Sequence, residues 1–441
     1  MTATAPAPTT VAAPPQQPAA GGVAAARPTG TVQASRRMRG ALRKTPGKLW
    51  VAAVIASLAG LSVGLVGLVG ALGQSGQLEE AAAATQQLVG AQDVRNSLVG
   101  ADATATNAFL VGGLEPAQER ARYDAQVDDA AVSIAGLAAA EPQDAGPLGV
   151  ATSGLTLYTG LVEQARANNR QGFPVGAAYL DQASVELRAG LLPALDTVSG
   201  DSTDRVAGAV AAAGAASGPG IAAVVAGLAL VCVMIWLARR TRRRLNGGLV
   251  LSFVVVVATG VLGTVLLGTV GSRAQDIRDH EFQSTLDVSQ ALALATDAKS
   301  MESFTLIKRG SGQKYEETFQ SNVAAASEAL THSGEVDPQL ATLLDEWVGA
   351  HQEIRSLDDG GDWDAAVALA TDTSEGSPNA DFRAFADAAG QDVEASAAAT
   401  DDALASARTM ALVFGALLLV AGVIAAGAAL RGFNARLKEY R

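Results

Sequence analysis

Four long apolar runs divide the chain, at 49–72, 221–238, 248–270 and 410–430. Each has close to the ~20 apolar residues with which an α-helix crosses the hydrocarbon core of a bilayer. None contains a charged side chain or a histidine, whereas transporters, pumps and channels usually place such groups inside the membrane. The pattern therefore predicts four plain transmembrane helices and argues against a transport function.

Small residues recur four apart in two of these runs, for example at Gly60 and Gly64 in the first and at Gly260, Thr264 and Gly268 in the third. Such spacing lets membrane helices approach closely. Glycine is also common in membrane helices without any such role. We therefore keep both interpretations of these glycines open.

The two long segments between the runs, 73–220 and 271–409, have the period of amphipathic helices. The clearest apolar stripe follows the positions Leu340, Leu343, Trp347, Ala350, Ile354 and Leu357. Helix-breaking residues interrupt the pattern at 111–116, 141–147, 168–174, 308–313, 334–338 and 358–364. The sequence predicts an all-α membrane protein with one antiparallel four-helix bundle in each segment, and a kink at Pro193.

The two segments also match each other in layout. Asp102 stands seven residues before Phe109, and Asp297 stands seven residues before Phe304. Each half is predicted to consist of a span, a bundle and a second span. We therefore predict an internal duplication, although the residue-by-residue similarity is weak.

Charge is strongly sorted along the chain. The two bundle segments hold 43 of the 44 acidic residues, and half of the 32 basic residues lie in the short pieces 1–48, 239–247 and 431–441. Basic residues concentrate on the cytoplasmic side of membrane proteins. The pattern predicts a multi-pass cell-membrane protein with extracytoplasmic bundles and both termini in the cytoplasm. Residues 1–48 should form a disordered tail with a basic collar.

Nothing in the sequence indicates an enzyme. It contains no nucleophile elbow, P-loop or dinucleotide motif, and its three histidines lack the paired spacing of metal ligands. We expect no catalytic residue, no metal site and no cofactor, and the basic pieces next to the membrane do not indicate nucleic-acid binding. His351 should lie at the boundary of a bundle core.

The turns farthest from the membrane are candidate docking sites for an extracytoplasmic partner. Their polar and aromatic residues are Asn168, Asn169 and Arg170 in the first bundle, and Asp358, Asp359 and Trp363 in the second. Trp363 favours docking, because exposed tryptophan is typical of interfaces. The alternative is ordinary turn chemistry. Arg95, Arg166 and Arg355 could bind a carboxylate ligand, but pairing with neighbouring acids is the stronger expectation.

The basic turn between the second and third spans is the main candidate for a cytoplasmic contact surface. Its arginines are Arg239, Arg240, Arg242, Arg243 and Arg244. No cytoplasmic linker or signalling domain is expected in this sequence. A partner would therefore read any signal at this turn and at the two tails.

The plan of span, outer bundle and span resembles that of chemoreceptor-type sensors. The stretch Tyr158–Gly172, followed by Gly176–Leu180 and Leu191–Pro193, resembles a family of four-span actinobacterial membrane sensors. The resemblance rests on this single block. It implies that the protein acts together with two partners. One is an extracytoplasmic lipoprotein that binds glutamate, glutamine or aspartate, and the other is the cytosolic serine/threonine protein kinase G.

The leading hypothesis is a non-enzymatic transmembrane receptor that relays amino-acid status through a binding protein to a kinase. We keep two alternatives: a scaffolding protein of the envelope, and a chemoreceptor-like sensor that binds a small ligand directly.

Overall fold

The computed structural model describes residues 45–111, 115–172, 174–215, 218–241, 246–332 and 336–438 of the 441-residue chain. These residues form helices and no strand, which confirms the all-α prediction. The α-helices are α2 (Thr45–Val111), α3 (Ala117–Ala140), α4 (Ala145–Arg170), α5 (Val175–Glu186), α6 (Leu192–Gly214), α7 (Gly218–Thr241), α8 (Gly247–Ile277), α9 (Gln283–Ile307), α10 (Gln313–His332), α11 (Pro338–Asp359), α12 (Trp363–Thr371) and α13 (Pro378–Lys438). A 3₁₀ turn, η1 (Pro142–Asp144), and two π-helical turns, η2 (Leu187–Leu191) and η3 (Arg278–Phe282), link some of them.

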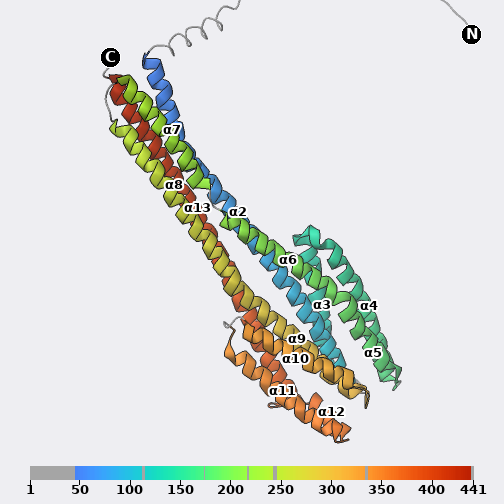
Figure 1. Ribbon diagram of the computed structural model, residues 1–441. Coiled ribbons are helices and arrows are strands. Elements are labelled where there is room, and N and C mark those ends of the chain that lie inside the picture. Colours follow the sequence, from blue (N-terminus) through green and yellow to red (C-terminus); the bar gives the residue numbers. More distant parts are fainter. Residues whose placement is uncertain are drawn as a thin grey trace, which may run out of the picture.

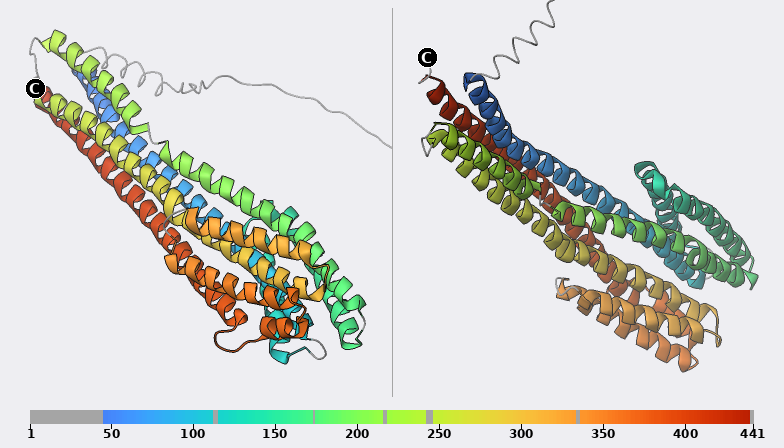
Figure 2. Two further views of the ribbon diagram at one scale, coloured as in Figure 1. Left: turned by 60° about the horizontal axis from the view of Figure 1, so that its bottom comes forward. Right: turned by 45° about the horizontal axis from the view of Figure 1, so that its top comes forward.

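Four of the described helices are long and apolar enough to cross a membrane, and they contain the four predicted spans. In these stretches, large apolar side chains point outward: Leu58, Val69, Val224 and Val261 are each 59–66% exposed. An outward apolar surface of this kind suits lipid and not water. The apolar parts of α2, α7, α8 and α13 run side by side at the end that holds the C terminus (Figures 1 and 2). We call them the span bundle.

Two helical units extend from the span bundle (Figure 1). The first unit consists of the distal part of α2 with α3, α4 and the bent rod α5–η2–α6. The second consists of α9, α10, α11, α12 and the distal part of α13. The predicted breaks separate most of these helices, because proline and glycine residues stop helices where they were expected to. The internal duplication stays a prediction.

The two units share one hydrophobic core. A single cluster of buried apolar residues includes Leu98 and Tyr158 of the first unit together with Phe304 and Trp347 of the second. Helix α2 contacts α9 and α12 of the second unit and also packs along α13. The units are therefore packed against each other and form one continuous distal body.

Two of the rods run from the distal end into the span bundle without a break. Helix α2 has 67 residues and α13 has 61. Their backbones meet in the membrane, where a Cβ added to Gly64 would lie 2.8 Å from the carbonyl oxygen of Leu418. Gly64 thus has the close-approach role, whereas a Cβ on Gly268 would meet nothing within 4 Å.

The helix that returns from the first unit is interrupted before its span. Helix α6 ends at Gly214, and Ala215 leaves helical geometry with φ −80° and ψ 45° before α7 begins at Gly218. The expected kink at Pro193 takes the form of the π turn η2, which places proline in the first turn of α6. A missing N–H is harmless at that position.

Candidate functional site

The predicted tip residues of the first unit lie in the last turn of α4 and not in a loop. The Asn168 side chain donates a hydrogen bond to the carbonyl oxygen of Gln164 (2.8 Å). Asn169 and Arg170 line a cavity of about 200 Å³. Gly172 then reverses the chain with φ +70°, a backbone conformation that favours glycine.

The predicted tip residues of the second unit are engaged in internal contacts. Asp358 and Asp359 form ion pairs with Arg355, at 2.6 and 2.5 Å. The indole N–H of Trp363 donates to the carbonyl oxygen of Leu306 (2.9 Å), and Arg309 lies 3.5 Å from the centroid of its ring. Trp363 is therefore half-buried, contrary to the expectation of an exposed interface residue. Partner docking at either tip stays a prediction.

The prediction that Arg95 and Arg166 pair with neighbouring acids is confirmed. Arg95 bonds to Asp196, and Arg166 bonds to Glu115 and Glu163 at 2.8 Å each. In the cytoplasmic candidate surface, Arg239 is exposed near the end of α7. The side chain of Arg240 and all of Arg242, Arg243 and Arg244 lie outside the described residues, so their contact role stays a prediction.

The strongest polar cluster joins the two units at a position that sequence analysis did not select. Asp102 of α2 is fully buried, and it accepts hydrogen bonds from Ser184 (2.6 Å), Ser300 (2.7 Å) and Arg188 (3.0 Å). The Arg188 guanidinium also bonds to Asp297 of α9, at 2.8 Å through Nε and 2.5 Å through Nη2. One arginine thus holds a carboxylate from each unit.

The π turn η2 supplies this arginine. Turns of this kind add a residue to the helical repeat and are frequent at functional sites. Burial lowers the pKa of Arg188, but the charges of Asp102 and Asp297 and their hydrogen bonds outweigh that effect and raise the pKa above its ordinary value. The guanidinium stays charged, so the contact behaves as a permanent ionic link.

A signal for this cluster was present in the sequence. Asp102 and Asp297 are the two residues that align when the halves are compared, each seven residues before a phenylalanine. Their matching positions in the two halves predict a repeat but do not by themselves indicate a contact. Their shared partner, Arg188, is 86 and 109 residues away in the chain, so no local pattern could indicate the pairing.

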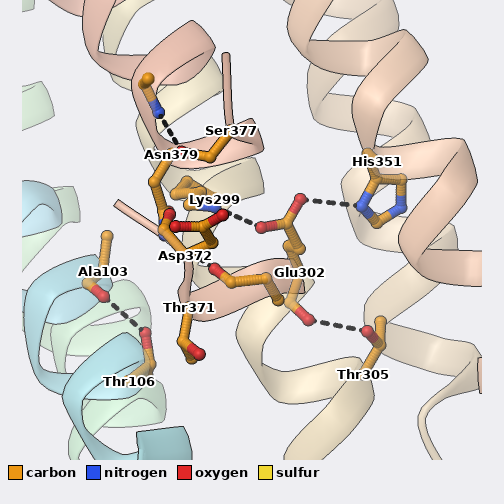
Figure 3. Close-up of polar contacts among 12 residues, drawn as sticks. Ala103, Thr106, Lys299, Glu302, Thr305, His351, Thr371, Asp372, Ser377 and Asn379 are labelled. Atoms are coloured by element: carbon orange, nitrogen blue, oxygen red, sulfur yellow. Dashed lines mark hydrogen bonds and ion pairs between the residues drawn. The ribbon is translucent and has the colours of Figure 1, made fainter. Parts of the chain in front are cut away.

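A second charged cluster lies inside the second unit (Figure 3). Lys299 bonds to Glu302, whose other oxygen lies 3.0 Å from Nδ1 of His351. Nε2 of His351 lies 3.1 Å from Glu316, and its ring stacks on Phe319 with centroids 3.7 Å apart. His351 is only 1% exposed, so the expectation of a boundary residue was wrong.

The pKa values of this cluster are perturbed in a consistent way. Burial lowers the pKa of His351, but hydrogen bonds and charges from Glu302 and Glu316 raise it overall. Burial raises the pKa of Glu302, but Lys299 and His351 lower it to about 2. The cluster is therefore most stable when histidine is protonated and Glu302 is ionised.

A second link joins the units near their distal ends. Asp181 of α5 accepts from Lys308 (2.9 Å) and from the Tyr315 hydroxyl (2.6 Å), both in the second unit. Burial raises the pKa of Asp181, but these two partners lower it overall. Together with Arg188, this contact ties the units at two levels.

None of these clusters has the composition of a metal centre. Among the described residues, no group of three or more histidine, cysteine or acidic side chains could hold a metal ion. The charged groups are arranged as ion pairs that stabilise helix positions. Their arrangement suits transmission of a movement between helices.

Comparison with known families identifies a match in the first unit. Residues 77–211 match the family described as Actinobacterial sensor domain. The match covers the first unit and less than a third of the chain. Searches of curated proteins and of solved structures each found no significant match. The family match and the four membrane-length helices together support a multi-pass membrane sensor, and the sensor-like part is the first unit.

Proposed function

We propose that this protein is a non-enzymatic transmembrane receptor that relays extracellular amino-acid status to a cytosolic serine/threonine kinase. The amino acids implied by the family resemblance are glutamate, aspartate and glutamine. In this proposal an extracytoplasmic binding lipoprotein docks at the distal tips, around Asn168–Arg170 and Asp358–Trp363. The basic pieces next to the membrane face the kinase.

One structural observation carries the proposal. Helices α2 and α13 run unbroken from the distal body into the span bundle, where their backbones are in contact. A rigid helix can pass on a shift of an ångström or two, which is a known mode of transmembrane switching. The ionic links between the units make them respond together to a force at either tip.

Disulfide crosslinking between α2 and α13 tests the relay. The Ser57 hydroxyl lies 3.4 Å from the carbonyl oxygen of Ala426, so these two positions lie next to each other on α2 and α13. Cys232 is the sole native cysteine and would first be replaced by serine. We expect the crosslinking rate of the Ser57→Cys, Ala426→Cys variant in membranes to change when the amino-acid-loaded binding protein is added.

A scaffold predicts a different outcome. Its helices hold partners without moving, so the crosslinking rate would be the same with and without the loaded binding protein. The unloaded binding protein is the matched control, since it separates docking from ligand status. An unchanged rate in all three conditions would exclude the relay.

A further inference from the structure

The distal end of the first unit contains a small, partly open cavity of about 200 Å³. It lies between α2, the start of α3, the end of α4 and α5. Liquid water occupies ~30 Å³ per molecule, so the cavity has room for roughly six or seven waters or for one short-chain organic acid. This volume suits a small molecule.

The lining of the cavity contains both apolar and charged side chains. Its apolar residues are Ala105, Ala108, Phe109, Val162, Ala165 and Leu180. Its charged residues are Arg120, Arg166, Arg170 and Glu115, and the neighbouring Glu163 pairs with Arg120 (2.9 Å) and with Arg166 (2.8 Å). Apolar side chains next to arginines suit a molecule with a short carbon chain and a carboxylate.

The start of α3 adds to the positive potential. Ala117, the first residue of α3, lines the cavity, and its N-cap Pro116 makes no side-chain capping bond. The first N–H groups of a 24-residue helix therefore lie near the cavity without a side-chain cap. Helix N-termini favour anions through these N–H groups and the helix dipole.

A carboxylate from the protein occupies the arginine site in the present structure. Arg166 is 91% buried; its Nη2 bonds to Glu115 (2.8 Å), and its guanidinium carbon lies 4.1 Å from the centroid of the Tyr123 ring. Glu115 also approaches Arg120, at 3.9 Å. Arg170 is exposed and forms no side-chain hydrogen bond or ion pair with the described residues.

From these contacts we infer that the cavity binds a small organic carboxylate directly, and that Glu115 competes with this ligand for the arginines. The ligand carboxylate contacts Arg166 and Arg170, and its carbon chain packs against the apolar side chains of the lining. Glu115 directly precedes Pro116 at the start of α3, so its release frees the start of a helix that packs on α2. The inference deepens the proposed receptor function and rests on it.

Calorimetric titration of the full chain in lipid nanodiscs tests the inference, with glutamate, succinate and inorganic phosphate as separate probes. We expect glutamate or succinate to bind and phosphate not to, because phosphate has no carbon chain for the apolar side chains. Arg170→Ala should weaken binding roughly tenfold, the usual effect of losing one charge-assisted hydrogen bond. Glu115→Gln should tighten it several-fold, because the competing charge is removed.

Arg122→Ala is the matched control. Arg122 lies on α3 and pairs with Glu119 at 3.2 Å, and it does not line the cavity. Its replacement should leave binding unchanged, whereas Arg170 and Glu115 are close to the surface and their variants should fold. Absence of binding by both carboxylates would overturn the inference. So would phosphate binding as tight as the carboxylates, or affinities that neither Arg170→Ala nor Glu115→Gln changes.

The result of this titration is independent of the result of the crosslinking experiment on the relay. Carboxylate binding with an unresponsive α2–α13 crosslink would keep the site and remove the relay. A crosslink that responds to the loaded binding protein, with no carboxylate binding to the full chain, would remove the site and keep the relay.

Discussion

The two units are both helical but differ in their buried polar groups. In the first unit, the hydroxyls of Tyr123 and Tyr158 are buried without a hydrogen-bond partner among the described residues, and the cavity lies at the distal end. In the second unit, Lys299, Glu302 and His351 form a buried ionic chain. An ionic centre resists rearrangement because separated charges are costly in a low-dielectric interior.

The difference indicates a division of roles. The first unit, which matches the sensor family, contains the cavity and is connected to the span bundle by the continuous rod α2 and by the interrupted pair α6 and α7. The second has a buried ionic chain and the continuous rod α13. We therefore expect the first unit to respond to a ligand, and both α2 and α13 to pass the response on. The following predictions test this comparison.

Removal of Arg188 should have the largest effect, because it breaks the link between the units. Arg188→Met leaves the buried carboxylate of Asp102 without its cation, and losing one partner of a buried pair costs about 3–5 kcal/mol. Thermal melts in detergent should show a marked loss of stability. A double variant with Asp102→Asn should recover part of it, and Arg122→Ala should melt like the wild type.

A change of pH near neutrality should act mainly on the second unit. Of the three histidines, His332 and His351 lie there and His280 lies in η3. His351 faces Glu302 and Glu316, with Lys299 and Arg355 next in the cluster. Its folded pKa lies above its unfolded value of about 6.5, so its stabilisation is complete below that pH and is lost as pH rises through the folded pKa.

His351→Gln should therefore remove this pH dependence and lower stability by about 2–3 kcal/mol at pH 6. Melts recorded between pH 5 and 9 would show it. His332→Gln is the control, because His332 is 68% exposed and should change little. A wild-type melting temperature independent of pH over this range would contradict the assignment.

Glycine substitutions in the spans test which glycines allow close helix contact and which only reflect the usual composition of membrane helices. Gly64→Ala should cost about 1–3 kcal/mol, because the added methyl group would press on the backbone of α13. Gly268→Ala, in an open position of α8, should be tolerated. Equal melting temperatures for the two variants would show that α2 and α13 are not in close contact.

The smallest effect is expected at the distal link. Asp181→Asn keeps the shape of the side chain but weakens the bonds from Lys308 and Tyr315, at a cost of about 1 kcal/mol. Hydrogen exchange at the start of α10 should increase. The core of the first unit, for example around Leu155, should keep its protection.

Much of the fold was predictable because its signals are local. Apolar runs, helical periods and turn residues such as Pro116 and Gly172 are read over a few neighbouring positions. The structure bears out the spans and most of the helix boundaries for that reason. The break at Ala215 was not predicted, although Gly214 before it and Gly218, Pro219 and Gly220 after it are helix-breaking residues.

The sites were less predictable because they depend on contacts between distant segments. Asp102 and Ser300 are 198 residues apart, and Glu302 and His351 are 49 apart. His351 stands beside the apolar stripe of Trp347, which predicts a boundary position, and only packing shows that it is enclosed. Asn169 and Arg170 are predicted docking residues, and the structure adds the cavity beside them.

The interruption at Ala215 has a consequence for the direction in which information leaves the molecule. A continuous helix transmits torsion as well as axial displacement, but a break in helical geometry lets the two parts rotate independently. Twisting of α6 is therefore not passed rigidly to α7. Helices α2 and α13 have no such interruption, and α8 continues through η3 into α9, so torque from the distal body can reach the span bundle along these rods but not along α6 and α7.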